Sequence, residues 1–188
     1  NIYDKYESMN ALERGNILHD IFCDFMVYVK EQNLKVTLDL KDKIYKIADS
    51  VVNEHYRNRP KYAYGIIKKD KEYIYSCIDL FLLKESNRNS EPLFFELGFG
   101  KRDKEHEAVC FYLGEDFFNF SGRIDRIDKV GEHEYSVIDY KTGKFKKYDK
   151  KDYFKCGANF QPILYANAVE ELFKKYNIDK QAKVTKTG

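Results

Sequence analysis

Two stretches decide the expected fold: Gly122-Arg-Ile-Asp-Arg-Ile-Asp128 and, further along the chain, Val137-Ile-Asp-Tyr-Lys-Thr-Gly143. Each stretch is typical of a β-strand, in which alternate side chains share one face. Asp139 and Lys141 are therefore expected to point the same way. A hairpin between the two strands would place Asp125 beside Asp139. The pattern thus predicts two carboxylates and an amine gathered at a strand end.

Carboxylates and a lysine at a strand end suit a particular chemistry. Two carboxylates form a hard-oxygen site that suits Mg²⁺, and a lysine beside them holds a water or stabilises developing negative charge. This combination fits metal-assisted hydrolysis of a phosphodiester. The alternative is a surface strand with a cross-strand ion pair. Two other Asp-x-Lys triplets, Asp39-Leu-Lys41 and Asp149-Lys-Lys151, lack both a preceding apolar strand and a second acid one hairpin upstream.

The composition is that of a folded domain. Of the 188 residues 43% are hydrophobic and 16% aromatic, with only 10 Gly and 3 Pro, which excludes a disordered or low-complexity chain. No apolar run is long enough to span a membrane, and the start lacks a signal-peptide layout. Because the chain starts without Met and ends at Lys186-Thr-Gly188, we expect a domain cut from a longer protein. We predict a single domain over residues 1–188, cytoplasmic and without membrane contact.

The cysteines support the same compartment. They show neither the close pairing of a metal knuckle nor the spacing of a disulfide framework, so we expect reduced thiols. The four are Cys23, Cys77, Cys110 and Cys156.

The order of predicted elements indicates an α+β or mixed α/β class. Apolar residues at three-to-four spacing predict helices over 8–31, 41–57, 68–84 and 159–176. Ser8 is the expected N-cap of the first helix, and Pro162 is expected in the first turn of the last. Extended segments are expected over 92–97, 107–113, 117–127 and 134–141, with another strand beginning at Val184. We therefore predict a mainly helical part over 1–90 and, over 91–188, a sheet core built on a meander of three or four strands.

Other candidate residues have plain structural alternatives. His19 on the first helix would ordinarily be a half-buried structural histidine, and Glu96 an edge-strand charge. Gln161 and Tyr165, one helical turn apart, fit a polar helix surface next to a core tyrosine. Six lysines within 141–151 form either a solvated loop or a patch facing phosphates: Lys141, Lys144, Lys146, Lys147, Lys150 and Lys151. The net charge of +2 favours neither interpretation.

Taken together, the motifs resemble those of RecB-type nuclease domains of the PD-(D/E)XK superfamily. His19, the stretches 122–128 and 139–143, and Gln161-x-x-x-Tyr165 occur in the order typical of that family. The wording is most similar to the nuclease domain of the AddB/RexB subunit of ATP-dependent helicase–nucleases. Glu96-Leu-Gly-Phe-Gly100 resembles the Glu-containing segment before the first motif strand in that branch. The resemblance covers most of the chain.

The resemblance implies a fold and roles for single residues. The fold is a restriction-endonuclease-like mixed sheet flanked by helices, with residues 32–90 as a helical insertion that shapes the DNA channel. The implied metal ligands are His19, Asp125, Asp139 and the backbone carbonyl of Tyr140, with Asp125, Asp139 and Lys141 as the catalytic residues. The implied supporting and DNA-contacting residues are Gln161, Tyr165, Arg123, Lys144, Lys146 and Lys147. Glu96 is left out of the ligand set.

The implied cofactor is Mg²⁺ or Mn²⁺, and an imidazole ligand fits Mn²⁺ at least as well as Mg²⁺. AddB-like proteins often carry four cysteines for an iron–sulfur cluster. The cysteines here lack that clustered spacing, so we expect no cluster in these residues, and the same spacing disfavours a Cas4-like nuclease. The implied function is a DNA exonuclease in double-strand break repair, acting on single-stranded ends with an AddA-like helicase–nuclease partner. A catalytically inactive DNA-binding scaffold and a stand-alone phage-type exonuclease are the alternatives.

Overall fold

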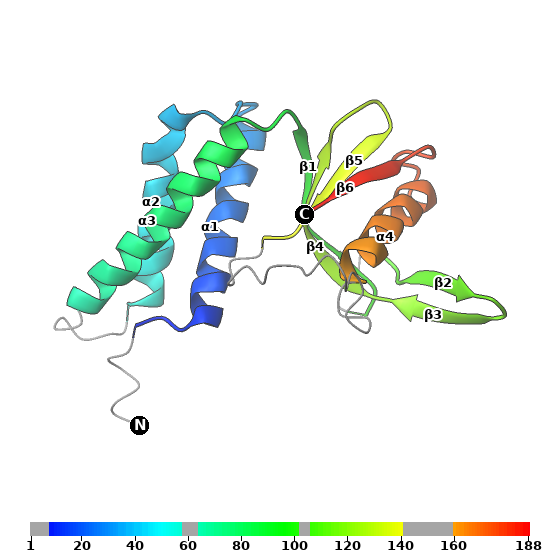
Figure 1. Cartoon of the computed structure of the whole chain (residues 1–188), viewed down its shortest axis with the longest axis horizontal. Helices are drawn as coiled ribbons and strands as arrows, with labels where there is room; N and C mark the ends of the chain where they lie inside the picture. The colour runs from blue at the N-terminus through cyan, green and yellow to red at the C-terminus, as the bar shows by residue number, and fades with distance from the viewer. Residues whose placement is uncertain (1–7, 58–63, 102–105, 141–159) are drawn as a thin grey trace, which may run out of the picture. The chain divides into compact units, whose positions relative to one another are not determined.

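The computed structural model describes residues 8–57, 64–101, 106–140 and 160–188, except for the side chain of Leu113. The described residues form two compact units, one helical and one containing the β-strands, which join in sequence between Arg88 and Asn89 (Figure 1). That the chain acts as a single domain stays a prediction. Among the described helices, none has the length and apolar character needed to cross a membrane.

The N-terminal unit consists of helices packed side by side (Figure 1): α1 (Ala11–Glu31), the short 3-10 helix η2 (Leu38–Leu40), α2 (Lys41–His55) and α3 (Tyr64–Ser86). The three α-helices match the predicted ones, although α3 begins earlier than its apolar spacing indicates. Their buried side chains recur at helical spacing, as an amphipathic stripe requires. The rings of Phe22 on α1 and Phe81 on α3 stack with centroids 4.1 Å apart, which joins the first helix to the third.

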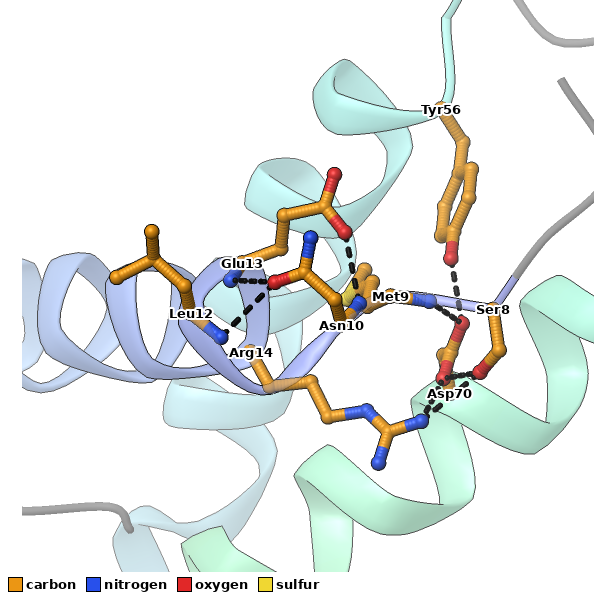
Figure 2. Close-up of polar contacts among 8 residues, drawn as sticks. All are labelled: Ser8, Met9, Asn10, Leu12, Glu13, Arg14, Tyr56 and Asp70. Carbon is orange, nitrogen blue, oxygen red and sulfur yellow. Dashed lines mark hydrogen bonds and ion pairs between the residues drawn. The ribbon is translucent and has the colours of Figure 1, made fainter. Parts of the chain in front are cut away.

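The start of α1 differs from the prediction. Asn10, not Ser8, is the N-cap: its side chain accepts hydrogen bonds from the backbone N–H groups of Leu12 and Glu13, and the Glu13 carboxylate accepts from the Asn10 N–H. This reciprocal arrangement is a capping box. Ser8 instead donates to the carboxylate of Asp70 at 2.6 Å (Figure 2). The two residues are alike as helix caps, and only the tertiary contact of Ser8 separates their roles.

Asp70 is the polar anchor of the helical unit. Its side chain on α3 is 1% exposed, and it accepts hydrogen bonds from the Met9 N–H at 2.9 Å and the Tyr56 hydroxyl at 2.5 Å, besides Ser8. Arg14 adds an ion pair at 3.2 Å (Figure 2). Burial raises the pKa of the Asp70 carboxyl, but these donors and the Arg14 charge outweigh it, so the pKa lies below its ordinary value. Asp70 thus ties α3 to the start of α1 and to the residue that follows α2.

The C-terminal unit is built on a four-stranded sheet in the order β1-β4-β5-β6. Antiparallel pairing joins β1 to β4 and β4 to β5, whereas β5 and β6 are parallel and connected through α4. The elements are β1 (Glu91–Phe99), β2 (Val109–Leu113), β3 (Asp116–Phe120), β4 (Gly122–Lys129), β5 (Glu134–Ile138), α4 (Gln161–Lys175) and β6 (Lys183–Thr187). The predicted mixed α/β class is confirmed.

The predicted meander is wrong in one respect. The segment expected as a single strand over 117–127 is two strands, and β2 and β3 form a separate hairpin between β1 and β4 (Figure 1). The chain leaves the sheet at Gly100 and returns at Ser121, where a Cβ built on Gly100 would lie 2.0 Å from the Ser121 hydroxyl oxygen. Gly100 also has a positive φ of 89°, which glycine adopts without strain. Only glycine fits this crossing.

Helix α4 packs on the sheet through small and large apolar residues. Ala168, Val169, Leu172 and Phe173 of α4 are buried in one core with strand residues. The Phe173 ring meets Tyr135 of β5 edge-to-face, with centroids 4.9 Å apart, a favourable aromatic geometry. Proline lies in the first turn of α4, as predicted, where its missing N–H costs no helical hydrogen bond.

We expect Asp70→Asn to destabilise the helical unit by about 3 kcal/mol, because buried donors and the Arg14 charge lose an anionic acceptor. Urea unfolding followed by circular dichroism measures this loss. Asp49→Asn is the matched control: Asp49 also accepts from a lysine and a tyrosine on α3, but its side chain is 43% exposed. Solvent screening limits the control's loss to less than about 1 kcal/mol.

The Asp70 effect also has a defined pH dependence. A carboxyl whose pKa is lowered by folding contributes its stability above the unfolded pKa, about 3.9, and loses it as the pH falls through the folded value. The advantage of wild type over Asp70→Asn is therefore full at neutral pH and shrinks below about pH 4. Equal losses for the Asp70 and Asp49 variants at neutral pH would contradict the anchoring role.

Candidate functional site

The register of the sheet brings two acids together on neighbouring strands. Leu97 of β1 pairs with Ile124 of β4, so Glu96 lies opposite Asp125. Each offers a carboxylate oxygen, and these oxygens lie within 4.8 Å of each other. Glu96 has a φ of 51°, in the left-handed region. For a non-glycine residue that conformation costs about 1–3 kcal/mol, and it persists only where the surrounding structure enforces it.

A third acid extends the row across β5. Arg126 of β4 pairs with Ile138 of β5, so the same antiparallel register places Asp125 opposite Asp139, directly after the end of β5. The backbone N–H of Tyr140 donates a hydrogen bond to the Asp125 carboxylate at 2.8 Å. Side chains directly opposite in an antiparallel pair have Cβ atoms about 5 Å apart. The expected proximity of Asp125 and Asp139 therefore has a backbone basis.

We call Glu96, Asp125 and Asp139 the acid row. Like charges directly opposite one another destabilise a sheet. Arg123 lies 3.2 Å from the Glu96 carboxylate, but its side chain is 65% exposed, so water screens this pair. Carboxylate and carbonyl oxygens are the ligands that hard divalent cations prefer. The donor chemistry of the row therefore fits a divalent metal, which would relieve the repulsion among its members.

The structure places the remaining predicted ligands less completely. His19 lies on α1 with its side chain 25% exposed and its Nδ1 3.9 Å from the Asp20 carboxylate. It belongs to the helical unit, and its approach to the acid row stays a prediction. Lys141, the expected catalytic amine, lies outside the described residues, as do Lys144, Lys146 and Lys147. Their roles also stay predictions.

Tyr165 supports the first residue of β4. Its half-buried ring on α4 lies 6.5 Å from the ring of Phe99 and 5.8 Å from that of Phe120, centroid to centroid. A Cβ on Gly122 would lie 3.0 Å from Cε1 of Tyr165. Glycine at the start of the 122–128 stretch therefore leaves space for this ring. Gln161 is exposed at the first residue of α4.

Sequence reasoning left Glu96 out of the ligand set, whereas the structure places it next to Asp125. In the sequence it resembles an ordinary edge-strand charge. The informative signal is the pairing of β1 with β4, which depends on the inserted hairpin and is not readable from alternation alone.

A sequence model of the PD-(D/E)XK nuclease superfamily matches residues 3–187. The chain belongs to this superfamily. The predicted family is thereby confirmed, and the mixed sheet with N-terminal helices is consistent with the restriction-endonuclease-like fold expected for it. Nucleases of this superfamily use divalent metals, in agreement with the oxygen donors of the acid row.

Individual relatives narrow the resemblance, and each is the same subunit of an ATP-dependent helicase/deoxyribonuclease. That of Clostridium perfringens strain SM101 is 29% identical over 179 residues, which cover 88% of this chain and 15% of the relative. That of Clostridium acetobutylicum is 27% identical over 197 residues, covering 98% and 16%. That of Carboxydothermus hydrogenoformans is 26% identical over 180 residues, covering 87% and 16%. The chain thus spans less than a fifth of the length of these curated relatives.

Neutralising one member of the acid row should stabilise the metal-free protein. We expect Asp139→Asn and Glu96→Gln to raise the melting temperature without divalent metal by about 1–3 °C, because repulsion is relieved. Millimolar Mn²⁺ should raise the melting temperature of wild type more than that of either variant, since a ligand stabilises in proportion to its affinity for the folded state. Differential scanning calorimetry measures both effects.

Glu171→Gln is the control for this experiment. Glu171 lies in an exposed ion pair with Lys174 on α4, away from the three strand positions. Its substitution should leave the metal-dependent rise intact. A wild-type melting temperature that responds to neither Mg²⁺ nor Mn²⁺ would contradict the metal assignment.

Proposed function

We propose that this chain is a Mg²⁺- or Mn²⁺-dependent deoxyribonuclease domain that removes nucleotides from DNA ends as an exonuclease. The single observation that carries the proposal is the acid row on β1, β4 and β5 of a chain that belongs to a nuclease superfamily. A surface strand with a cross-strand ion pair does not account for the row, because its described cation, Arg123, is largely solvated.

In this proposal the chain's own groups have separate tasks. Asp125, Asp139, His19 and the Tyr140 carbonyl would hold the metal, and Glu96 adds a carboxylate beside Asp125. A divalent cation bound there stabilises negative charge on phosphoryl oxygens and acidifies a water molecule. The Tyr140 N–H fixes one oxygen of Asp125, so this carboxylate is oriented before any ligand arrives.

The amine and the exposed polar groups would act on the DNA. Lys141 would stabilise the charge that develops at the phosphorus. Arg123, 65% exposed at the start of β4, and Gln161, exposed at the start of α4, would contact the DNA backbone. Lys144, Lys146 and Lys147 would add cationic contacts. Because such contacts position DNA without reading its bases, we propose weak sequence preference.

The relatives suggest the wider setting. They are named as subunits of an ATP-dependent helicase/deoxyribonuclease. We therefore propose that the whole protein works with an AddA-like helicase–nuclease subunit in the cytoplasm, in double-strand break repair. A helicase supplies single-stranded ends, and these are the proposed substrate.

Removing one member of the proposed catalytic set should abolish hydrolysis. We expect Asp125→Asn, Asp139→Asn and Lys141→Ala each to slow degradation of end-labelled single-stranded DNA on the order of 100-fold or more, because each removes charge stabilisation in the transition state. Gel electrophoresis with Mg²⁺ or Mn²⁺ measures the rate. Single-nucleotide products would indicate an exonuclease.

The other Asp-x-Lys triplet supplies matched controls. Asp39→Asn and Lys41→Ala change the same residue types at exposed positions of the helical unit and should leave the rate unchanged. Wild type that binds DNA but cleaves nothing with either metal would favour the inactive scaffold. Efficient digestion of linear duplex ends without a helicase would favour the stand-alone exonuclease.

Backbone binding should depend on salt in a predictable way. In the non-cleaving Asp139→Asn background, replacing Arg123, Lys144, Lys146 or Lys147 by Ala should lower the slope of log affinity against log salt by about 0.7 for each phosphate that is no longer neutralised on single-stranded DNA. Fluorescence anisotropy at several NaCl concentrations measures this slope. Lys69→Ala, exposed on α3, is the control and should keep the wild-type slope.

A further inference from the structure

A buried ion pair lies on β4 next to the acid row. Arg126 and Asp128 are 1% and 0% exposed. The guanidinium of Arg126 donates two hydrogen bonds to the Asp128 carboxylate, from Nε at 2.5 Å and from Nη2 at 2.7 Å. Ser90, directly before β1, donates to the same carboxylate at 2.6 Å. This bidentate arrangement fixes the guanidinium plane.

The pair reaches the site through Tyr140. The remaining guanidinium nitrogen of Arg126, Nη1, donates to the Tyr140 hydroxyl at 3.3 Å. The backbone N–H of the same tyrosine donates to Asp125 at 2.8 Å. Successive side chains of a strand leave it on opposite faces, so Asp125 and Arg126 diverge from β4. Tyr140 contacts both and is held at its ring and at its backbone.

Stability alone does not account for a buried pair of this kind. Replacing a buried ion pair by apolar residues of similar volume is often neutral or stabilising, because both charges lose their hydration. What such a pair supplies is a fixed direction. Here the direction is passed to Tyr140, which follows Asp139 in the chain and precedes Lys141. A backbone carbonyl and a neighbouring side chain can be aimed only by fixing the peptide units that carry them.

We propose that Arg126 and Asp128 are positioning residues of the proposed metal site and act through the Tyr140 hydroxyl. The pair, supported by Ser90, holds Tyr140 so that its N–H orients Asp125 and its carbonyl is preset as a ligand. The inference rests on the proposed function for the identity of the site. It adds residues that touch neither metal nor DNA to the groups that determine metal affinity.

The direct test removes only the hydroxyl that receives the Arg126 hydrogen bond. In the 188-residue chain, Tyr140→Phe should weaken Mn²⁺ binding about tenfold, since loss of an outer-shell partner typically costs 10–100-fold in metal affinity or activity. Isothermal titration calorimetry with Mn²⁺ measures the affinity without any turnover. In DNA degradation, Tyr140→Phe should be slow at low Mn²⁺ and recover at saturating Mn²⁺.

Tyr135→Phe is the matched control. Tyr135 on the neighbouring strand β5 is also a hydrogen-bonded tyrosine, and its hydroxyl donates to Asp179 at 2.7 Å. Its substitution removes the same atom from the same unit, so it reports the purely structural cost of a lost hydroxyl. We expect unchanged Mn²⁺ affinity for this variant.

A second variant perturbs the pair from its far end. Asp128→Asn would leave the Arg126 charge buried without its partner, so a folding defect could obscure its effect. Ser90→Ala is milder and should weaken Mn²⁺ binding in wild type but cause no further loss in the Tyr140→Phe background. This non-additivity is the signature of residues that act through one another.

The outcomes separate this inference from the nuclease proposal. If wild type degrades no DNA but Tyr140→Phe still weakens Mn²⁺ binding, the positioning role stands and the nuclease proposal fails. If Tyr140→Phe and Tyr135→Phe bind Mn²⁺ equally well, the positioning role is overturned even in an active nuclease. Absence of Mn²⁺ binding by wild type overturns both.

Discussion

The antiparallel register from β1 through β4 to β5 is the constraint on which the site depends. A shift of one residue in either pairing would turn every side chain of the shifted strand to the other face. Glu96, Asp125 and Asp139 would then no longer lie opposite one another. Apolar burial stabilises this register, because the same pairings place Ile127 and Val137 in the core beneath α4. The energy that holds the acids together therefore comes from side chains that take no part in the chemistry.

The surroundings of the acid row are stiff at several points. The Tyr165 ring lies over Gly122 at one end of β4, and the Arg126–Asp128 pair is buried further along the same strand. Tyr140 contacts that pair as well as Asp125. A site that binds a small ion gains affinity when its ligands are oriented in advance, since less conformational entropy is lost on binding. The Gly122–Asp128 stretch thus supplies one candidate ligand together with much of its support.

The sequence predicts the helices, most of the strands and the family, because these depend on local periodicity and on short motifs. It also predicts that Asp125 and Asp139 lie on neighbouring strands, since a short hairpin connects them. It fails where the answer depends on distant contacts. Ser8 and Asn10 are equally good N-caps until Asp70, far along the chain, engages Ser8. Glu96 resembles an edge charge until β4 returns beside β1 across the inserted hairpin. Lys141 and the lysines that follow it lie outside the described residues, so the sequence remains the basis for their roles.

The close crossing of Gly100 and Ser121 has a consequence for how this chain tolerates change. Because the two ends of the β2–β3 hairpin meet at that point, the hairpin is a side branch of the sheet. The strands on either side of the branch are held together by their own ladder. Lengthening, trimming or exchanging the branch beyond these two residues leaves the spacing of the acids unaffected, provided that the aromatic residues packed near Tyr165 are kept. New contact surfaces can therefore be grafted there while the ion-binding strands stay as they are.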